Sequence, residues 1–253
     1  MMMNFTLSNQ VQIPAVGIGT FMMTPDQAEQ AVVDALACGY RMIDTAQAYM
    51  NERAVGRGIK RSGVAREDIF ISTKIWASQY LTEGTVEKSL ELLGTDYIDL
   101  MFIHQPAGDF MAGYRKLETV AIRPMVNQIE MHPYFAQESA LKVMEEYQIV
   151  PEAWAPLGGG RHNPFEMVKE IAAAHGKTVG QVVLRWNVQR GVVVIPKSVH
   201  KARIEENFQI WDFTLTEEEM QKISSLDLGY QGTAVKHFDP EFVKMCNIRK
   251  IHE

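Results

Sequence analysis

The sequence predicts an α/β fold, and within that class it favours a TIM-type barrel over a doubly wound sheet. Apolar runs such as VVVIP (192–196) resemble strands that are buried on both faces of a parallel sheet. Strand-like and helix-like segments alternate along the chain, which is typical of βα units. Polar side chains, namely Asp44, Lys74 and His104, end or follow three successive strands. A barrel collects its active site at that edge.

The individual elements follow in chain order. FTLSNQVQIP (5–14) predicts a small hairpin with Ser8 and Asn9 in its turn. Helical patterns include residues 24–39, with a threonine cap and a glycine stop, and residues 82–94, with a capping-type start and a glycine stop. Strands are expected at residues 15–19, 40–44, 69–73, 97–103, 125–130, 150–155 and 192–196.

The glycine pattern argues against a dinucleotide-binding doubly wound fold. GIGTF (17–21) is the nearest approach to G-x-G-x-x-G, and it lacks the third glycine. No stretch rich in proline, glycine or serine divides the chain, so residues 1–253 are expected to form a single domain.

Composition excludes several classes of function. The chain has 253 residues, 46% hydrophobic, and a net charge of −6 without a basic run, so nucleic acid is not an expected partner. Cys38 and Cys246 are far apart and lack metal-ligand spacing, which predicts no metal site and a reducing, cytoplasmic location. No secretory signal or membrane span is expected, and the sequence leaves monomer and dimer both open.

Asp44, Tyr49, Lys74 and His104 together suggest chemistry on a carbonyl group. A phenol has a pKa near 10, which a neighbouring ammonium lowers, and a carboxylate paired with the ammonium fixes its position. A histidine beside the phenol can donate a hydrogen bond to a carbonyl oxygen. Each residue alone has a structural interpretation, such as a helix cap or a core histidine. Their coincidence at strand ends favours a catalytic site.

The same segments identify a family. GYRMIDTAQAYMNERAVGRGI, ISTKIW and DLMFIHQP resemble the tyrosine, lysine and histidine motifs of aldo-keto reductases, and the later segments MVNQIEMHPYF, AWAPLGGG and IPKSVHKARIEENF resemble their cofactor segments. Within the family the chain is most similar to bacterial reductases of the diketogluconate reductase type. The resemblance implies that Tyr49 is the general acid, that Lys74 and Asp44 tune it, and that His104 orients the substrate.

The resemblance also implies NADPH as the cofactor and a small carbonyl compound as the substrate. Phe21 and Trp76 match walls of the substrate pocket, together with His104. The implied cofactor contacts are Gly19, Thr20, Gln128, Trp154, Leu157, Gly159, Lys197, Ser198, Arg203, Glu206 and Asn207.

One part of the cofactor assignment has independent physical support. PKSVHKAR (196–203) places cations and a hydroxyl just before and within the first turn of a predicted helix. Backbone N–H groups and the helix dipole favour an anion there, and arginine suits a phosphate. The alternative is a solvated, charged helix start.

The alternation of strands and helices expected for the family is interrupted after residue 118. The family has eight strands, and seven are counted here. One strand–helix unit of roughly 30 residues, with the fifth strand, is expected to be missing between AGDFMAGYRKLE (107–118) and TVAIRPMVNQIE (119–130). The chain then carries a true deletion, or covers the gap by exchange or dimerisation, or the molecule contains a segment that this sequence lacks.

Two functions follow from these observations. The first is an NADPH-dependent reductase of aldehydes or ketones with Tyr49 as the general acid. The second is a catalytically impaired or inactive protein that binds NADPH or serves as an assembly partner. The complete set of four residues favours the first, and the missing unit favours the second.

Overall fold

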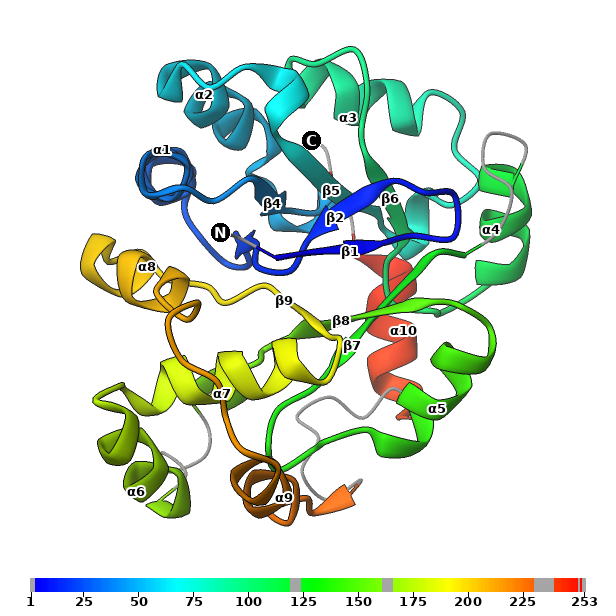
Figure 1. Ribbon diagram of the computed structural model, residues 1–253. Coiled ribbons are helices and arrows are strands. Elements are labelled where there is room, and N and C mark those ends of the chain that lie inside the picture. Colours follow the sequence, from blue (N-terminus) through cyan, green and yellow to red (C-terminus); the bar gives the residue numbers. More distant parts are fainter. Residues whose placement is uncertain (1–2, 119–123, 161–165, 230–238, 250, 252–253) are drawn as a thin grey trace. The chain divides into compact units, whose positions relative to one another are not determined.

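The computed structural model of the chain describes residues 3–118, 124–160, 166–229, 239–249 and 251 (Figure 1). The chain divides into two compact units. The first unit comprises Met1–Ile18 and Pro124–Ala234, and the second comprises Gly19–Arg123 and Val235–Glu253. Among the helices that are described, none combines the length and the apolar character needed to cross a membrane.

A four-stranded sheet lies at the centre of the second unit. Its strand order is β3 (Ile18–Gly19, of which Gly19 belongs to this unit), β4 (Met42–Asp44), β5 (Phe70–Ile75) and β6 (Leu100–Ile103). β4, β5 and β6 run parallel, with Asp44 opposite Ser72 and Lys74 opposite Phe102. Every residue of β4 and β5 is buried, as expected for strands covered on both faces.

Sequence signals place the first two helices of the second unit. Thr24 and Gln27 form a capping box at the start of α1 (Pro25–Cys38), and Gly39 ends it with a φ of 113°. α2 (Glu52–Ser62) packs closely on α1, since a Cβ on Gly58 would lie 2.8 Å from the Glu29 carbonyl oxygen.

The remaining helices of the second unit include one correction. The capping-type start expected near residue 82 is wrong, because α3 begins at Thr85 after Gly84, which has a φ of 71° and offers no capping side chain. The unit also contains the helices α3 (Thr85–Leu93), α4 (Phe110–Glu118) and α10 (Pro240–Ile248), and the 3₁₀ helices η1 (Gln47–Tyr49), η2 (Arg66–Asp68) and η3 (Ala77–Gln79).

The first unit carries the hairpin and a second parallel sheet. β1 (Asn4–Thr6) and β2 (Gln12–Pro14) are antiparallel, and the turn between them includes Ser8 and Asn9 as predicted. The sheet has the order β7 (Val126–Glu130), β8 (Val150–Trp154) and β9 (Val193–Val194).

Capping boxes and a buried cluster define the helices of the first unit. Thr178 with Gln181 caps α7 (Val179–Gln189), and Thr216 with Glu219 caps α9 (Glu217–Ser224). Trp186 is the largest side chain in a cluster that also contains Val168. The helices are α5 (Glu138–Glu146), α6 (Glu166–His175), α7 (Val179–Gln189), α8 (Lys201–Phe208) and α9 (Glu217–Ser224), with the 3₁₀ helix η4 (Gly158–Gly160).

The connection after α4 agrees with the expected missing unit. α4 ends at Glu118 and the next strand, β7, begins at Val126, with residues 119–123 outside the described part of the chain. Apart from the hairpin, the described residues form seven strands, β3 to β9, as counted from the sequence. The single-domain interpretation of residues 1–253 stays a prediction.

Candidate functional site

A buried ion pair is the base of the candidate site. Lys74 Nζ lies 2.5 Å from Asp44 Oδ2 and 2.7 Å from the Thr45 carbonyl oxygen. The two side chains are only 3% and 2% exposed, and the Ser72 hydroxyl donates to Asp44 Oδ1 at 2.9 Å. Because both groups sit on adjacent strands of one sheet, the register of β4 with β5 fixes their distance.

Tyr49 lies directly beside this pair. It is the last residue of η1, which follows β4 after a short connection, and Met50 ends that turn with a φ of 58°. Lys74 Nζ is 5.0 Å from the centroid of the Tyr49 ring. An ammonium at this range stabilises the phenolate relative to the phenol. The Phe21 ring, 55% exposed, meets Tyr49 edge-on at 5.2 Å between centroids.

His104 faces Tyr49 from the end of β6. The two rings meet edge-on with centroids 5.7 Å apart, and the ring of Trp76 lies 4.9 Å from that of His104. Burial lowers the pKa of His104 well below its usual value, and the positive charges of Lys74 and Arg249 lower it further. The imidazole is therefore neutral at physiological pH. Its Nδ1 is buried without a hydrogen-bond partner among the described residues.

The sequence reasoning missed two residues that hold this site together. Asn51 Nδ2 donates to the carbonyl oxygens of Thr20 and Met23, and its Oδ1 accepts the Thr45 hydroxyl at 3.0 Å. Glu52 is buried and accepts the Thr73 hydroxyl at 2.7 Å. Both directly follow Tyr49 in YMNE, and two polar residues immediately after the candidate tyrosine are the signal that could have found them.

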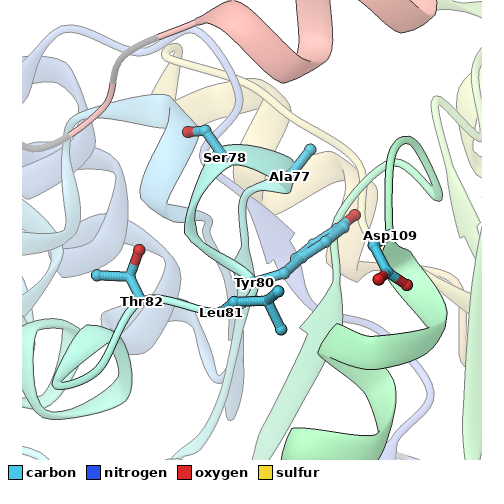
Figure 2. A pocket seen from close by; sticks show the side chains of 6 residues that line it. All are labelled: Ala77, Ser78, Tyr80, Leu81, Thr82 and Asp109. Carbon is cyan, nitrogen blue, oxygen red and sulfur yellow. The ribbon is translucent and has the colours of Figure 1, made fainter.

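A pocket lies near the four residues but does not contain them. It has a volume of about 320 Å³ and is lined by Ala77, Ser78, Tyr80, Leu81, Thr82 and Asp109 (Figure 2). The Tyr80 hydroxyl is 2.7 Å from the carbonyl oxygens of both His104 and Gln105. Tyr80 therefore supports the backbone that carries His104.

In the first unit, the expected phosphate-binding residues lie at the start of α8. Lys197 and Arg203 are exposed, and neither has a carboxylate within ion-pair distance in the described part of the chain. The N-cap residue of α8 is His200, and its side chain makes no capping hydrogen bond with the described residues. Ser198 Oγ accepts the His200 N–H at 3.1 Å. Two unpaired cations beside an uncapped helix start suit an anion such as a phosphate.

The other predicted cofactor residues of the first unit are spread along β7, β8, η4 and α8. Gln128 Nε2 lies 2.5 Å from Glu152 Oε1 on the neighbouring strand. Trp154 ends β8, and the Glu206 carboxylate accepts the Thr178 hydroxyl at 2.8 Å. The remaining members are Leu157, which packs on the Trp186 cluster, Gly159 with a φ of 61°, and Asn207, which is buried.

The two predicted cofactor residues at the start of the second unit are buried. Gly19 belongs to β3, and the Thr20 N–H and hydroxyl both donate to the Asp44 carbonyl oxygen, at 3.0 and 3.1 Å. Thr20 thus has an observed role in holding the end of β4. Its contact with a cofactor stays a prediction.

The described residues contain no group of three histidine, cysteine or acidic side chains that could hold a metal ion. What the site offers chemically is a phenol, Tyr49, with a buried ion pair beside its ring, and a neutral imidazole, His104, next to it. Such a site can polarise a carbonyl oxygen and protonate it.

Comparison with known proteins gives a consistent result. The sequence model of the Aldo/keto reductase family matches residues 15–121 and, separately, residues 111–228. The two matches meet where the sequence indicates the missing unit. The 9,11-endoperoxide prostaglandin H2 reductase of Trypanosoma cruzi is 42% identical over 257 residues, which cover 88% of this chain and 90% of that protein.

Solved structures agree. An aldo/keto reductase from Brucella melitensis is 39% identical with a TM-score of 0.85, over 90% of this chain and 100% of that one. A Bombyx mori aldo-keto reductase in complex with NADP is 28% identical with a TM-score of 0.86, over 96% of this chain and 97% of that one. These likenesses confirm the predicted α/β fold class of the TIM-barrel type.

Proposed function

Because this chain belongs to the aldo/keto reductase family and is therefore an oxidoreductase, we propose that it reduces an aldehyde or ketone to an alcohol with NADPH, with Tyr49 as the general acid. One observation carries this proposal: the buried Lys74–Asp44 pair lies against the ring of Tyr49, and neutral His104 faces the same ring.

Each of these residues has one role in the proposed mechanism. His104, held neutral by burial, donates a hydrogen bond from its ring to the substrate oxygen and orients the carbonyl group. Lys74 stabilises the phenolate, so that Tyr49 gives up its proton readily as the oxygen gains negative charge. Asp44 keeps the ammonium charged and in place. Phe21 and Trp76 form apolar walls beside the tyrosine and the histidine.

NADPH fits the residues at the start of α8. Lys197 and Arg203 would bind its 2′-phosphate, because they are cations without a carboxylate partner among the described residues. Gln128, Trp154, Leu157, Gly159, Ser198, Glu206 and Asn207 are the further contacts proposed from the family resemblance, with Gly19 and Thr20. When bound, NADPH supplies the hydride that reaches the carbonyl carbon.

The first test separates catalysis from binding. NADPH binding is followed by the quenching of tryptophan fluorescence, and turnover by the oxidation of NADPH in the presence of simple aldehydes. Tyr49→Phe removes only the phenolic hydroxyl, so the variant should bind NADPH as the wild type does and lose turnover. Normal turnover by this variant would show that Tyr49 is not the acid.

A second variant tests the phosphate site directly. Lys197→Met combined with Arg203→Met should weaken NADPH binding by at least about tenfold, because charge-assisted hydrogen bonds to the phosphate are lost. NADH lacks that phosphate, so its affinity should change little. Equal losses for both nucleotides would place the 2′-phosphate elsewhere.

The missing unit after residue 118 supports one alternative, an inactive protein that binds NADPH or assists an assembly. Tight NADPH binding by the wild type without reduction of any aldehyde or ketone would favour this alternative. Absence of NADPH binding would exclude the reductase.

A further inference from the structure

The C-terminal helix of the second unit brings a cation, Arg249, to the candidate site. α10 ends at Ile248 and packs against η3, and the Ser78 hydroxyl donates to the Arg249 carbonyl oxygen at 3.1 Å. Cys246, one turn earlier, is completely buried in the cluster that includes Trp76 and Tyr80. These contacts fix the backbone that carries Arg249.

The guanidinium lies close to the proposed catalytic residues. Its Nη2 donates to the Ala48 carbonyl oxygen at 3.0 Å, and Ala48 immediately precedes Tyr49. Its central carbon is 5.4 Å from the centroid of the Trp76 ring, which in turn contacts the His104 ring. Its positive charge also contributes to lowering the pKa of His104.

This cation lacks a carboxylate partner in the described part of the chain. Several arginines of the same unit are paired with a carboxylate, namely Arg57 and Arg61 with Glu29, and Arg66 with Asp99, whereas Arg41 donates to the Leu36 and Tyr40 carbonyl oxygens. Arg249 is exposed, and with the described residues its guanidinium makes one hydrogen bond, to the Ala48 carbonyl oxygen. A guanidinium has five N–H donors in a planar fork that matches a carboxylate, so most of its donors can serve a ligand.

We propose that Arg249 binds a carboxylate carried by the substrate, so that the preferred substrates are oxo acids, that is, aldehydes or ketones with a carboxylate group. This inference rests on the proposed reductase function. The carboxylate takes no part in the bond changes, since the carbonyl carbon gains the hydride and its oxygen gains the proton from Tyr49. Arg249 is thus a specificity residue.

A purely structural role is the competing explanation. The bond to Ala48 and the contact with Trp76 could serve only to hold α10 in place. A charged and a neutral substrate of similar shape distinguish carboxylate binding from a structural role, because loss of a structural role should affect the reduction of both substrates alike. 4-Formylbenzoate and 4-formylbenzamide form such a pair, and the 3-formyl isomers provide a second spacing between the aldehyde and the charge.

The experiment compares kcat/KM for the two members of each pair. The wild type should prefer the carboxylate at one spacing or both. Two variants test Arg249: Arg249→Gln keeps an N–H donor for Ala48, and Arg249→Met does not. Both should reduce the ratio of kcat/KM for the carboxylate to kcat/KM for the amide by at least about tenfold, mainly through a higher KM for the carboxylate. Lys244→Met is the matched control, because Lys244 is an exposed cation of the same helix without an ion-pair partner among the described residues. It should leave the ratio unchanged.

The outcomes distinguish this inference from the proposed function. Reduction of the amides without preference for the carboxylates, or a ratio that Arg249→Gln leaves intact, would overturn the role of Arg249 and leave the reductase standing. If none of the four aldehydes is reduced, the proposed function fails. Binding of 4-(hydroxymethyl)benzoate, followed by tryptophan fluorescence, then decides whether Arg249 binds a carboxylate at this site. Binding that both Arg249 variants lose would support this role, and binding that they retain, or no binding by the wild type, would overturn it.

Discussion

The buried ion pair between Lys74 and Asp44 leads to a quantitative prediction about stability. Both side chains are at most 3% exposed, so the magnitudes known for buried pairs apply. Lys74→Met leaves the carboxylate of Asp44 buried without its counter-charge, and we expect it to lower the free energy of unfolding by about 3–5 kcal/mol. The Ser72 hydroxyl stays beside the carboxylate, but a neutral donor does not replace a charge.

The double variant carries the decisive information. Asp44→Asn alone leaves the ammonium of Lys74 buried and should cost a similar amount. Asp44→Asn with Lys74→Met removes both charges, so neither is left unpaired. Its cost should be smaller than the sum of the two single costs by about 0.5–3 kcal/mol, the usual range for groups in direct contact.

Urea unfolding followed by circular dichroism measures these free energies. Lys88→Met is the matched control, because Lys88 pairs with Glu91 at 2.7 Å but is 43% exposed, and exposed pairs contribute little. If the two single costs simply add, or if Lys74→Met costs no more than Lys88→Met, the pair is not a coupled buried unit and the explanation for the tuning of Tyr49 fails.

Three further predictions concern pH and packing. Because the pKa of His104 is lowered on folding, the unfolded chain binds more protons than the folded chain below about pH 6.5, so the free energy of unfolding should fall on acidification. Urea unfolding at several pH values should show a smaller fall for His104→Asn. Burial raises the pKa of Glu52, so above about pH 4.3 the folded state binds more protons than the unfolded state. The free energy of unfolding should therefore decline as the pH rises from about 4.3 through the raised pKa, and Glu52→Gln should remove this decline. Gly58→Ala should cost about 1–3 kcal/mol, since its Cβ would lie 2.8 Å from the Glu29 carbonyl oxygen, whereas Gly180→Ala in α7, with no contact under 3.7 Å, should not destabilise; thermal unfolding compares the two.

The fold class and the proximity of the four central residues could be predicted because their signals are local. The threonine cap and the glycine stop of α1 lie within one segment, and Asp44, Lys74 and His104 each follow or end an apolar run. The start of α3 could not be placed in this way. TEGT offers threonines that resemble caps, yet the helix begins at Thr85 after Gly84, which adopts a left-handed conformation and has no side chain to cap the helix.

Arg249 shows a different limit of sequence reasoning. It is separated from Ala48 by 201 positions, and nothing in CNIRKIHE distinguishes this arginine from a solvated one. Its proximity to Trp76 depends on the burial of Cys246 and on the packing of α10 against η3. Both are contacts between distant parts of the sequence, which no local pattern reports.

The location of the break after α4 has a consequence for the proposed chemistry. The ion pair and its partners come from β4, β5 and β6, which are neighbours in one sheet, and from η1, which follows β4; all four elements precede the break in the chain. Their mutual distances depend on strand register within that sheet, so loss of a later unit does not remove the contacts through which Lys74 is proposed to tune Tyr49. Hydride transfer also requires a cofactor aligned to within about 1 Å, and misalignment of that size costs on the order of a hundredfold in rate. A deletion should therefore reduce kcat through cofactor alignment, while the pH dependence set by Tyr49 and Lys74 is retained in whatever turnover remains.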